Sequence, residues 1–385
     1  MNRLVVVFAV FALACGGQNQ QTEAQQKAAP KGAPKGPPAP ALMDCGVHGD
    51  IDILCGARSP EDLELTPDNK YLLVPQFVNA GGAGRGGPPP TGLGIQLFDI
   101  SKKTFSLIPV TDEPRNDWGD ASCPGPIGDK LVSHGISLNK RNNGMWELYV
   151  VNHGGGRQSM EMYELKQTGG MWGLIWHGCV VSKPDFKDYN DVAALPDGSF
   201  IATHPTAFQP TGPQAQQFDL FSGVASGFVG RWTAGEGEKE LPNTRIGYPN
   251  GVLVSADGRY MYVNAWTAKE VHKYDLKDND KEVGMVRLDF MPDNITWTAK
   301  HQMLAAGVKG ARGECSGSPC QSTFGVALID PATMKAKATF DSTTNKDTAG
   351  KAPTITGVSV ALEVGNSMYV GAFSGNRLVK LPMPK

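Results

Sequence analysis

Charge is scarce in this chain and nearly balanced. Charged residues make up 19% of the 385 positions, the formal net charge is −2, and Lys and Arg form no run. Binding to nucleic acid or to an anionic membrane surface needs concentrated positive charge. The composition therefore excludes both as expected partners.

Long amphipathic helical stretches are also lacking, as are two familiar sequence motifs. The chain contains 47 glycines and 28 prolines, and its apolar segments are short, which favours an all-β protein. No CxxC pair is present, so zinc is the weaker metal hypothesis. No GxSxG sequence is present, which argues against a serine hydrolase.

The N-terminal hydrophobic run is too short to span a bilayer. Arg3 precedes an apolar stretch at residues 4–14, as in a secretion signal. The sequence around Cys15 resembles a bacterial lipoprotein cleavage box, although Leu13 stands one place closer to the cysteine than usual. We therefore expect an exported protein whose membrane attachment is a lipid on Cys15, with plain secretion as the alternative.

Three segments follow from this pattern. Residues 1–15 are the expected signal peptide with its lipobox, which would anchor the protein to the bacterial cell envelope. Residues 16–42 are rich in Gln, Ala, Pro and Lys and are expected to be a disordered tether. Residues 43–385 are long enough for one large folded domain.

Six of the seven cysteines lie in the folded domain. An even number in an exported chain indicates disulfides. Proximity in the sequence favours Cys45–Cys55 and Cys315–Cys320, which leaves Cys123–Cys179. Many other connectivities are possible, so this pairing is a preference.

A polar turn followed by an apolar strand recurs along the domain. The turns contain Asp, Asn or Gly, and the intervals between them are irregular and long enough for a few strands each. Such repeats are typical of propeller blades. Six of them predict an all-β, six-bladed β-propeller, with a large β-sandwich as the alternative. The repeats occupy residues 66–74, 142–151, 195–203, 255–265, 298–307 and 364–373.

Two histidines flank the clearest hairpin signal in the chain. Asn143-Gly144, between two apolar arms, is typical of a two-residue turn. In an unbroken register, that turn pairs His134 directly with His153. Facing imidazoles suit a proton-relay dyad, in which one ring takes a proton from water and the other orients it. A pair of structural histidines at strand ends is the alternative.

Acidic and amide side chains precede the apolar strand in four of the repeats. A single pair of this kind is usually a turn or a cap, but matching positions in several blades predict that they meet at the central tunnel. Oxygen-only ligands suit a hard cation, and Ca²⁺ fits an exported protein. The residues are Glu61-Asp62, Asn190-Asp191, Asn250 and Asp293-Asn294.

These doublets can serve two ions, one above the other along the tunnel. Successive side chains of an extended segment point to opposite sides. Glu61 and Asp293 then give two negative charges to one ion, while Asp62 and Asp191 give two to the other. If Asp293 and Asn294 bind the same ion, the backbone there must be irregular.

The same residues stand in motifs that resemble the calcium-dependent paraoxonase/arylesterase family. The resemblance runs from about residue 60 to residue 381. The family's fold is a six-bladed propeller with two calcium ions in its tunnel, and its members hydrolyse lactones and aryl esters. The resemblance therefore implies a small-molecule lactone or ester as substrate. Its motifs are EDLEL at 61–65, HGIS at 134–137, VNH at 151–153, ND at 190–191, NG at 250–251 and DNI at 293–295.

Position by position, the resemblance implies two calcium sites and a catalytic pair. His134 and His153 take the positions of the family's histidine dyad, with His134 deprotonating the attacking water. The structural calcium would bind Asp62, Asp191 and the backbone carbonyl of Ile136. The catalytic calcium would polarise the substrate carbonyl. Its ligands would be Glu61, Asn190, Asn250, Asp293 and Asn294.

The chain departs from the family at its C-terminal end. Vertebrate members close the propeller with a disulfide between the two ends of the domain, but no cysteine follows Cys320 here. Closure must then come from strand pairing or from local disulfides. This departure leaves the metal and histidine positions unchanged.

The pocket above the ions should have apolar walls. Aromatic residues near blade edges and in connecting loops are candidates, with ordinary core packing as the alternative for each. These candidates are Phe77, Trp118, Phe208, Phe221, Trp266 and Phe373.

Two other functions stay open. A gluconolactonase- or regucalcin-like sugar lactonase would use one metal and would lack the paired histidines. A surface-anchored propeller that binds a partner would use calcium only for rigidity. The natural substrate and the oligomeric state are not indicated by the sequence.

Overall fold

The computed structural model describes residues 42–77, 94–111, 114–211, 214, 218–309, 323–344 and 354–383. The chain divides into two units, residues 1–39 and residues 40–385, and every described residue lies in the second. The predicted signal peptide, its lipobox and nearly all of the predicted tether lie outside the described residues, so they stay predictions. Among the described helices, none has the length and hydrophobicity needed to cross a membrane.

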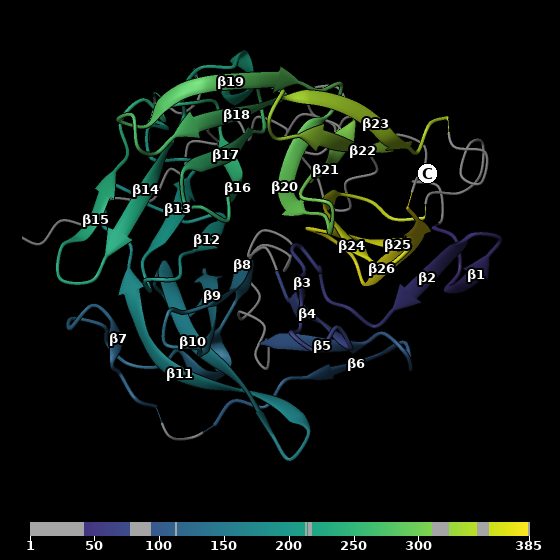
Figure 1. Ribbon diagram of the computed structural model, residues 1–385, viewed down its shortest axis with the longest axis horizontal. Helices are drawn as coiled ribbons and strands as arrows, with labels where there is room; N and C mark the ends of the chain where they lie inside the picture. Colours follow the sequence, from purple (N-terminus) through teal and green to yellow (C-terminus); the bar gives the residue numbers. More distant parts are fainter. Residues whose placement is uncertain are drawn as a thin grey trace, which may run out of the picture. The chain divides into compact units, whose positions relative to one another are not determined.

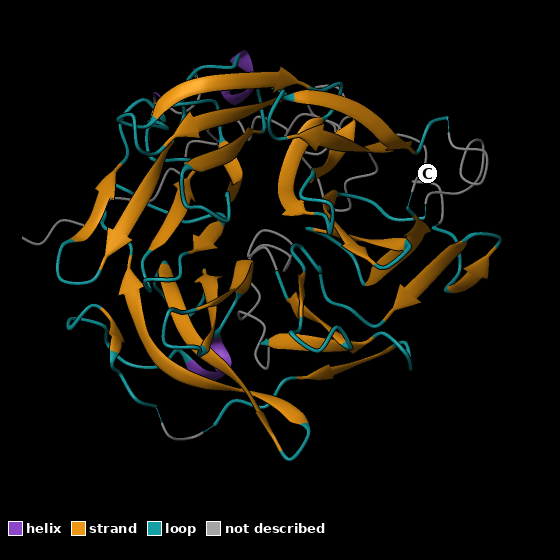
Figure 2. Cartoon of the chain, viewed as in Figure 1, coloured by secondary structure: helices purple, strands orange, loops and turns teal. Residues whose placement is uncertain are grey.

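Six sheets surround a common centre, and the second unit is a six-bladed β-propeller, as predicted (Figure 1). Strands form almost all of its regular structure (Figure 2). The described residues also include two short 3₁₀ helices, Gly128–Lys130 and Leu220–Ser222. All strand pairings are antiparallel except that of β7 with β11.

The first three blades are formed by residues 64–240, and each is described from its innermost strand outwards. The first contains β3 (Glu64–Leu65), β4 (Tyr71–Pro75), β5 (Ile95–Asp99) and β6 (Thr104–Leu107). The second contains β8 (Ser133–Lys140), β9 (Trp146–Asn152), β10 (Ser159–Thr168), β11 (Met171–Val181) and β7 (Trp118–Gly119). The third contains β12 (Val192–Ala194), β13 (Phe200–His204), β14 (Phe228–Thr233) and β15 (Gly237–Glu240).

The last three blades follow the same order, except that the sixth recruits strands from the start of the domain. The fourth contains β16 (Pro249–Val254), β17 (Tyr260–Ala265), β18 (Glu270–Asp275) and β19 (Lys281–Arg287). The fifth contains β20 (Met291–Trp297), β21 (Met303–Lys309), β22 (Thr323–Asp330) and β23 (Lys335–Asp341). The sixth contains β24 (Val358–Val364), β25 (Ser367–Ala372), β26 (Arg377–Pro382), β2 (Ile51–Cys55) and β1 (Gly46–His48).

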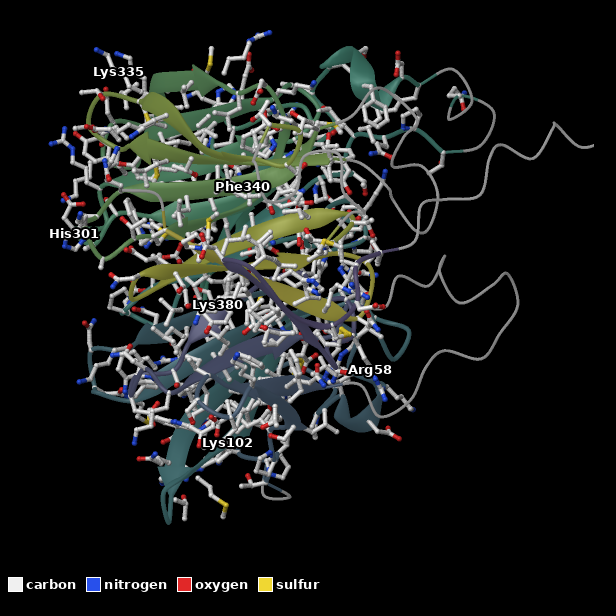
Figure 3. The ribbon with its side chains drawn as sticks, turned by 90° about the vertical axis from the view of Figure 1, so that its right-hand side faces the viewer. Arg58, Lys102, His301, Lys335, Phe340 and Lys380 are labelled. Carbon is white, nitrogen blue, oxygen red and sulfur yellow. A yellow bond between two sulfur atoms is a disulfide. The ribbon has the colours of Figure 1, made fainter. Side chains whose placement is uncertain are left out.

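Each predicted repeat contains the turn between the first and second strands of one blade. Residues with positive φ occupy several of these turns, including Asn69 at 58°, Gly198 at 85° and Gly258 at 65°. Glycine and asparagine adopt this backbone conformation at low cost. Figure 3 shows the propeller edge-on, with His301, in the turn after β20, and Arg58, before β3, toward opposite faces. The starts of the inner strands and their turns therefore lie at different ends of the tunnel.

Strand pairing closes the propeller. β2, near the start of the domain, pairs with β26, near its end, and Ile53 lies opposite Val379. The Cys45–Cys55 disulfide ties the segment before β1 to the end of β2. Closure therefore uses both means expected in the absence of a C-terminal cysteine.

Two of the three predicted disulfides are confirmed. Cys45 bonds to Cys55, and Cys123 bonds to Cys179. The second bond joins the loop after β7 to β11 in the second blade. The predicted Cys315–Cys320 bond lies outside the described residues.

The closing strand also carries core side chains. Ile53 is 2% exposed and belongs to an apolar cluster with Val379, Phe324 and Phe340, which links the sixth blade to the fifth. Burial of such side chains between sheets is the main favourable term for a propeller. The strength of closure therefore depends on β2 as well as on β26.

We expect Ile53→Ala to lower the free energy of unfolding by about 2–5 kcal/mol, because it leaves a cavity at the blade junction. Urea unfolding measures the change. Val47→Ala, in β1 and 66% exposed, is the matched control and should change stability by less than about 0.5 kcal/mol. Equal effects of the two substitutions would contradict the role given to β2.

Candidate active site

Irregularities at matching positions in four inner strands shape the centre of the propeller. The strand register shifts between Ser133 and Ile136 in β8, between Pro249 and Val252 in β16, between Pro292 and Ile295 in β20, and between Val358 and Val360 in β24. Bulges redirect side chains and interrupt pairing. The predicted irregularity at Asp293-Asn294 is confirmed by the shift in β20.

Two glycines allow the inner strands to approach each other closely. A Cβ atom on Gly135 would lie 2.6 Å from the carbonyl oxygen of Asn190 and 2.6 Å from Asp191 Oδ1. A Cβ atom on Gly251 would lie 2.6 Å from the carbonyl oxygen of Asp293. Any side chain at either position would push neighbouring blades apart, so these glycines hold the oxygen-bearing residues near one another.

The predicted ligands of the catalytic calcium, here called the first oxygen set, are Glu61, Asn190, Asn250, Asp293 and Asn294. All five are at most 5% exposed. Asn294 Nδ2 donates to Glu61 Oε1 at 2.9 Å and to the Glu61 carbonyl oxygen at 3.0 Å. The Asn250 side chain donates a hydrogen bond to Asp293. The structure thus brings residues from the first, fourth and fifth blades into direct or neighbouring contact.

Several oxygens of this set have no hydrogen-bond partner within the described part of the chain. They are buried, and such atoms normally cost free energy unless a donor or a cation satisfies them. A hard cation is a suitable partner, because it binds carboxylate and amide oxygens. The unpartnered atoms are Glu61 Oε2, Asn190 Oδ1, Asn250 Oδ1 and Asn294 Oδ1.

The predicted ligands of the structural calcium, here called the second oxygen set, are Asp62, Asp191 and the carbonyl of Ile136. Asp62 Oδ2 accepts from the Ile136 amide at 2.9 Å, and Asp191 Oδ2 accepts from the Val252 amide at 2.7 Å. A cavity of about 250 Å³ adjoins this set and is lined by both aspartates and by Glu64. Backbone amides therefore fix both carboxylates on the inner strands.

Burial raises the pKa of the carboxyl groups in both sets. Desolvation raises the pKa of Glu61 to about 8, against the opposing hydrogen bond from Asn294. Desolvation and the nearby Glu61 charge raise the pKa of Asp62 to about 8. Desolvation likewise holds the pKa values of Asp191 and Asp293 well above their usual range. Four buried carboxyls of like charge need a positive partner to ionise together, and divalent cations fit that need.

Carboxylates alone do not define the candidate metal sites. Among the described residues, no three Asp, Glu, His or Cys side chains form a group suited to a metal ion. Each set instead combines two carboxyl groups with amide or backbone oxygens. Calcium accepts such mixed oxygen ligands, whereas zinc prefers nitrogen and sulfur.

The hairpin register predicted from Asn143-Gly144 is wrong by one residue. The ladder ends with Lys140 opposite Trp146, and the Gly144 amide donates to the Arg141 carbonyl at 2.9 Å. Gly144 has a φ of 89°. These features define a three-residue loop built on a β-turn followed by a left-handed residue, rather than a two-residue turn.

The bulge in β8 restores contact between the two histidines. His134 lies inside the bulge, and His153 directly follows β9. His134 Nδ1 and His153 Nε2 are 2.8 Å apart, and the ring centroids are 4.9 Å apart. The other nitrogen, His134 Nε2, lies 3.6 Å from Glu61 Oε1. The pair therefore exists as predicted, although the residues are not direct cross-strand partners.

Both rings are held in the neutral form near neutral pH. Desolvation lowers the pKa of His134 to about 3, while the negative charge of Asp188 opposes the shift. Desolvation, with a smaller contribution from His134, lowers the pKa of His153 to about 4. A neutral imidazole has one bare nitrogen and can accept a proton. The arrangement is therefore available for general-base chemistry.

One aromatic candidate lies at the site and another does not. Phe77 stacks on His134, with ring centroids 4.0 Å apart and planes at 13°, and meets His153 edge-on at 5.9 Å. Trp118 instead stacks on His177 at 4.0 Å in the outer strands of the second blade. Its predicted place in the pocket wall is wrong, because β7 adds to the outer edge of the sheet. The other four candidates stay predictions.

Two residues of the site were not identified from the sequence. Asn264, buried in β17, donates Nδ2 to the Asp293 carbonyl at 2.8 Å, and an amide inside the apolar strand YMYVNA was the available signal. Gln158 Oε1 lies 2.5 Å from His153 Nδ1. It follows a glycine-rich turn and offered no comparable signal.

The fold and this site define a class: a six-bladed propeller with buried oxygen sets and a histidine pair at its centre. Residues 123–312 match the family model described as Arylesterase. Human serum paraoxonase/arylesterase 1 is 24% identical over 243 residues, which cover 61% of this chain and 62% of that protein. Human serum paraoxonase/lactonase 3 is 27% identical over 169 residues, or 42% and 45% of the two chains. The chain is thus a relative of the paraoxonase/arylesterase family, as its motifs indicated.

The matches cover only part of each relative. The alignment with the human arylesterase spans about three fifths of that protein's length. A solved structure of a luciferin-regenerating enzyme aligns with a TM-score of 0.49 and 14% identity, over 86% of this chain and 94% of that one. We base nothing on so distant a likeness.

In chelator-containing buffer, we expect the free energy of unfolding to fall as the pH rises from about 4 to about 8. The folded state retains protons on Glu61 and Asp62 after the unfolded chain has lost them, so stability is full below the unfolded pKa and declines up to the folded pKa. Each such carboxyl contributes up to ~1.4 kcal/mol per pH unit in that window. Urea unfolding at a series of pH values measures the slope.

Asp62→Asn should make this pH dependence shallower, because it removes one titrating group. The exposed Asp129→Asn should leave the slope as it is in the parent protein and is the matched control. A parent protein whose stability is constant across the window would contradict the origin given to these pKa shifts.

Proposed function

We propose that this propeller is a calcium-dependent hydrolase of lactones and aryl esters. The observation that carries the proposal is the junction at Glu61. This residue joins a buried set of unpartnered oxygens to a pair of neutral, hydrogen-bonded imidazoles. The relationship to the paraoxonase/arylesterase family supports the same chemistry.

The chemistry of the first oxygen set fits a calcium ion. Glu61 and Asp293 would supply its negative charge, and Asn190, Asn250 and Asn294 would supply neutral oxygens. When bound there, calcium supplies Lewis-acid stabilisation of the negative charge that develops on a substrate carbonyl oxygen. Asp62, Asp191 and the Ile136 carbonyl would hold a second ion with a structural role.

The histidine pair would manage the proton. His134 Nε2 would accept a proton from the attacking water, whose oxygen bonds to the ester carbonyl carbon. The proton would then pass to the leaving alkoxide or phenoxide oxygen as the ester C–O bond breaks. His153 would hold the His134 ring through the 2.8 Å hydrogen bond, while Phe77 covers one face of that ring.

Two described disulfides support an exported location, because such bonds persist in oxidising compartments. A lipid on Cys15 would then anchor the propeller to the bacterial cell envelope through residues 16–42. Attachment by a tether of this kind would leave the tunnel accessible to small substrates.

His134→Gln should lower kcat for phenyl acetate by about 10²–10⁴, the usual contribution of a general base. Its calcium content should stay unchanged, because His134 belongs to neither oxygen set. Steady-state kinetics and elemental analysis of the purified variant measure both quantities. His48→Gln, in β1, is the control and should retain parental kcat. Parental turnover in His134→Gln would remove the dyad from the mechanism.

Chelation should abolish hydrolysis of phenyl acetate and of a γ- or δ-lactone, and added Ca²⁺ should restore it. Asn250→Ala, in the first oxygen set, should raise the Ca²⁺ concentration required for half-maximal activity. Activity that survives chelation would exclude the calcium mechanism. Calcium-dependent stability without hydrolysis would favour the binding-propeller alternative, and hydrolysis of sugar lactones alone would favour the gluconolactonase-like one.

A further inference from the structure

We propose that Gln158 is a positioning residue that sets the tautomer of the histidine pair, so that the bare Nε2 of His134 faces the first oxygen set. The catalytic consequence of this arrangement rests on the proposed hydrolase function. The tautomer itself follows from hydrogen-bond chemistry and can be measured without any turnover. Gln158 belongs to neither oxygen set and lies outside the pair that the sequence predicted.

The side-chain amide of Gln158 determines the first proton. Its Oε1 atom lies 2.5 Å from His153 Nδ1. An amide oxygen can only accept a hydrogen bond, so His153 Nδ1 must carry the hydrogen. A neutral imidazole carries one hydrogen, which leaves His153 Nε2 bare.

The second proton follows from the first. His153 Nε2 lies 2.8 Å from His134 Nδ1. Because the His153 atom is bare, His134 Nδ1 must donate, and His134 Nε2 is then the bare nitrogen. This atom lies 3.6 Å from Glu61 Oε1. Gln158 thereby determines, through two hydrogen bonds, which nitrogen faces the oxygen set.

The opposite tautomer would block the proposed reaction. It would place a hydrogen on His134 Nε2, where it could donate to the Glu61 carboxyl but could not accept a proton from water. The ring cannot simply rotate to compensate, because Phe77 stacks on it at 4.0 Å and His153 holds its other nitrogen. A fixed tautomer is therefore a condition for the base.

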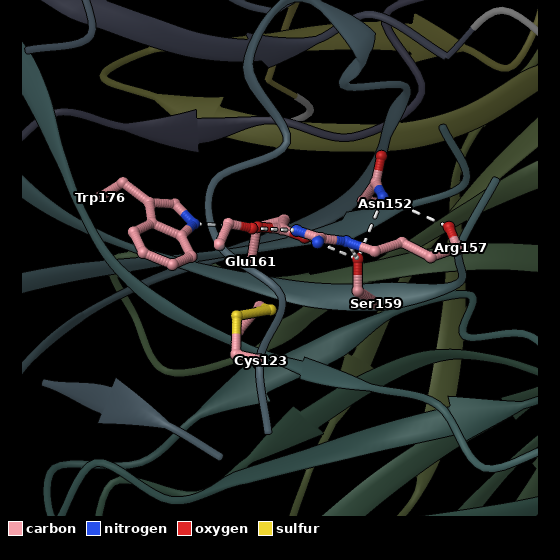
Figure 4. Close-up of a disulfide and its surroundings, with 8 residues drawn as sticks. Cys123, Asn152, Arg157, Ser159, Glu161 and Trp176 are labelled. Carbon is pink, nitrogen blue, oxygen red and sulfur yellow. Dashed lines mark hydrogen bonds and ion pairs between the residues drawn. A yellow bond between two sulfur atoms is a disulfide. The ribbon is translucent and has the colours of Figure 1, made fainter. Parts of the chain in front are cut away.

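The backbone around Gln158 is held on both sides. Arg157 Nη2 and Ser159 Oγ each donate to Glu61's counterpart in the second blade, the buried Glu161 Oε1, at 2.6 Å (Figure 4). Trp176 Nε1 donates to the other oxygen of Glu161 at 2.9 Å. Gln158 itself accepts from the Ser182 amide at 2.9 Å through its carbonyl oxygen.

A second branch of this network holds the segment that carries His153. Asn152 Nδ2 donates to Ser159 Oγ at 3.0 Å, and Asn152 Oδ1 accepts from the Gly154 amide at 2.8 Å (Figure 4). The residues on both sides of His153 and of Gln158 thus share one buried network. Glu161 also lies opposite Cys179 in the ladder, so the Cys123–Cys179 bond closes the same strand pair.

Long-range ¹H–¹⁵N spectra of the full-length protein, labelled at histidine and supplied with Ca²⁺, test the tautomer. They distinguish protonated from bare ring nitrogens, and His134→Gln and His153→Gln assign the signals. We expect Nδ1 to be protonated and Nε2 bare on both rings. A protonated His134 Nε2 in the parent protein would overturn the proposal.

Two substitutions of Gln158 test its role. Gln158→Glu keeps an acceptor-only group of the same length and should preserve both tautomers. Gln158→Met removes the acceptor and should give mixed tautomers, with kcat lowered about tenfold or more and KM little changed, since loss of a histidine's orienting partner acts on the chemical step. Gln167→Met, at an exposed position of β10, is the control and should change neither. Reversed tautomers in Gln158→Glu, or unchanged tautomers in Gln158→Met, would overturn the role of Gln158.

The outcomes separate this inference from the proposed function. A parent protein with the expected tautomers but no hydrolytic activity would contradict the proposed function and support the positioning role. An active parent protein with the opposite tautomer would do the reverse. The Gln158→Glu result remains decisive if Gln158→Met fails to fold.

Discussion

Burial of several carboxyl groups at the centre of the propeller is the constraint on which the rest of the site depends. Glu61, Asp62, Asp191 and Asp293 are each at most 5% exposed, and desolvation disfavours their charged forms. The fold satisfies some of their oxygens with backbone amides and leaves others unpartnered. A packed core has no use for such a cluster. Its cost is understandable if cations complete the structure, and the inner-strand bulges and glycines then serve to bring the oxygens together.

Much of the architecture could be predicted because turn chemistry is local. Asn69, Gly198 and Gly258 mark turns that need positive φ, and each marks the inner hairpin of a different blade. The oxygen-bearing doublets were visible for a similar reason, since an acid next to an amide directly before a buried strand has no role in the core. The irregular backbone at Asp293-Asn294 followed from requiring both side chains to face one ion. Residue type alone carried that information.

The remaining features depend on contacts between distant parts of the chain. Asn143-Gly144 fits both a two-residue turn and a longer loop, and the pairing of the two arms decides between them. The wrong register still led to the right pair because the bulge at His134 offsets the shift. The role of Gln158 could not be predicted, because a glutamine in a loop gains a partner only when the backbone on both sides is fixed by buried groups. Its neighbours form those contacts with the next strands of the blade.

Glu61 joins the two halves of the site, which explains why they must be examined separately. Its backbone carbonyl accepts hydrogen bonds from Asn294 Nδ2 at 3.0 Å and Ser359 Oγ at 2.5 Å, and its carboxyl group accepts from Asn294 and lies near His134. Displacing Glu61 would therefore disturb the oxygen set and the surroundings of the base together. Loss of activity in a Glu61 variant cannot distinguish a lost cation from a reoriented imidazole. Ring-nitrogen protonation can, because Gln158 sets it from the opposite side of the histidine pair, through contacts that do not include Glu61.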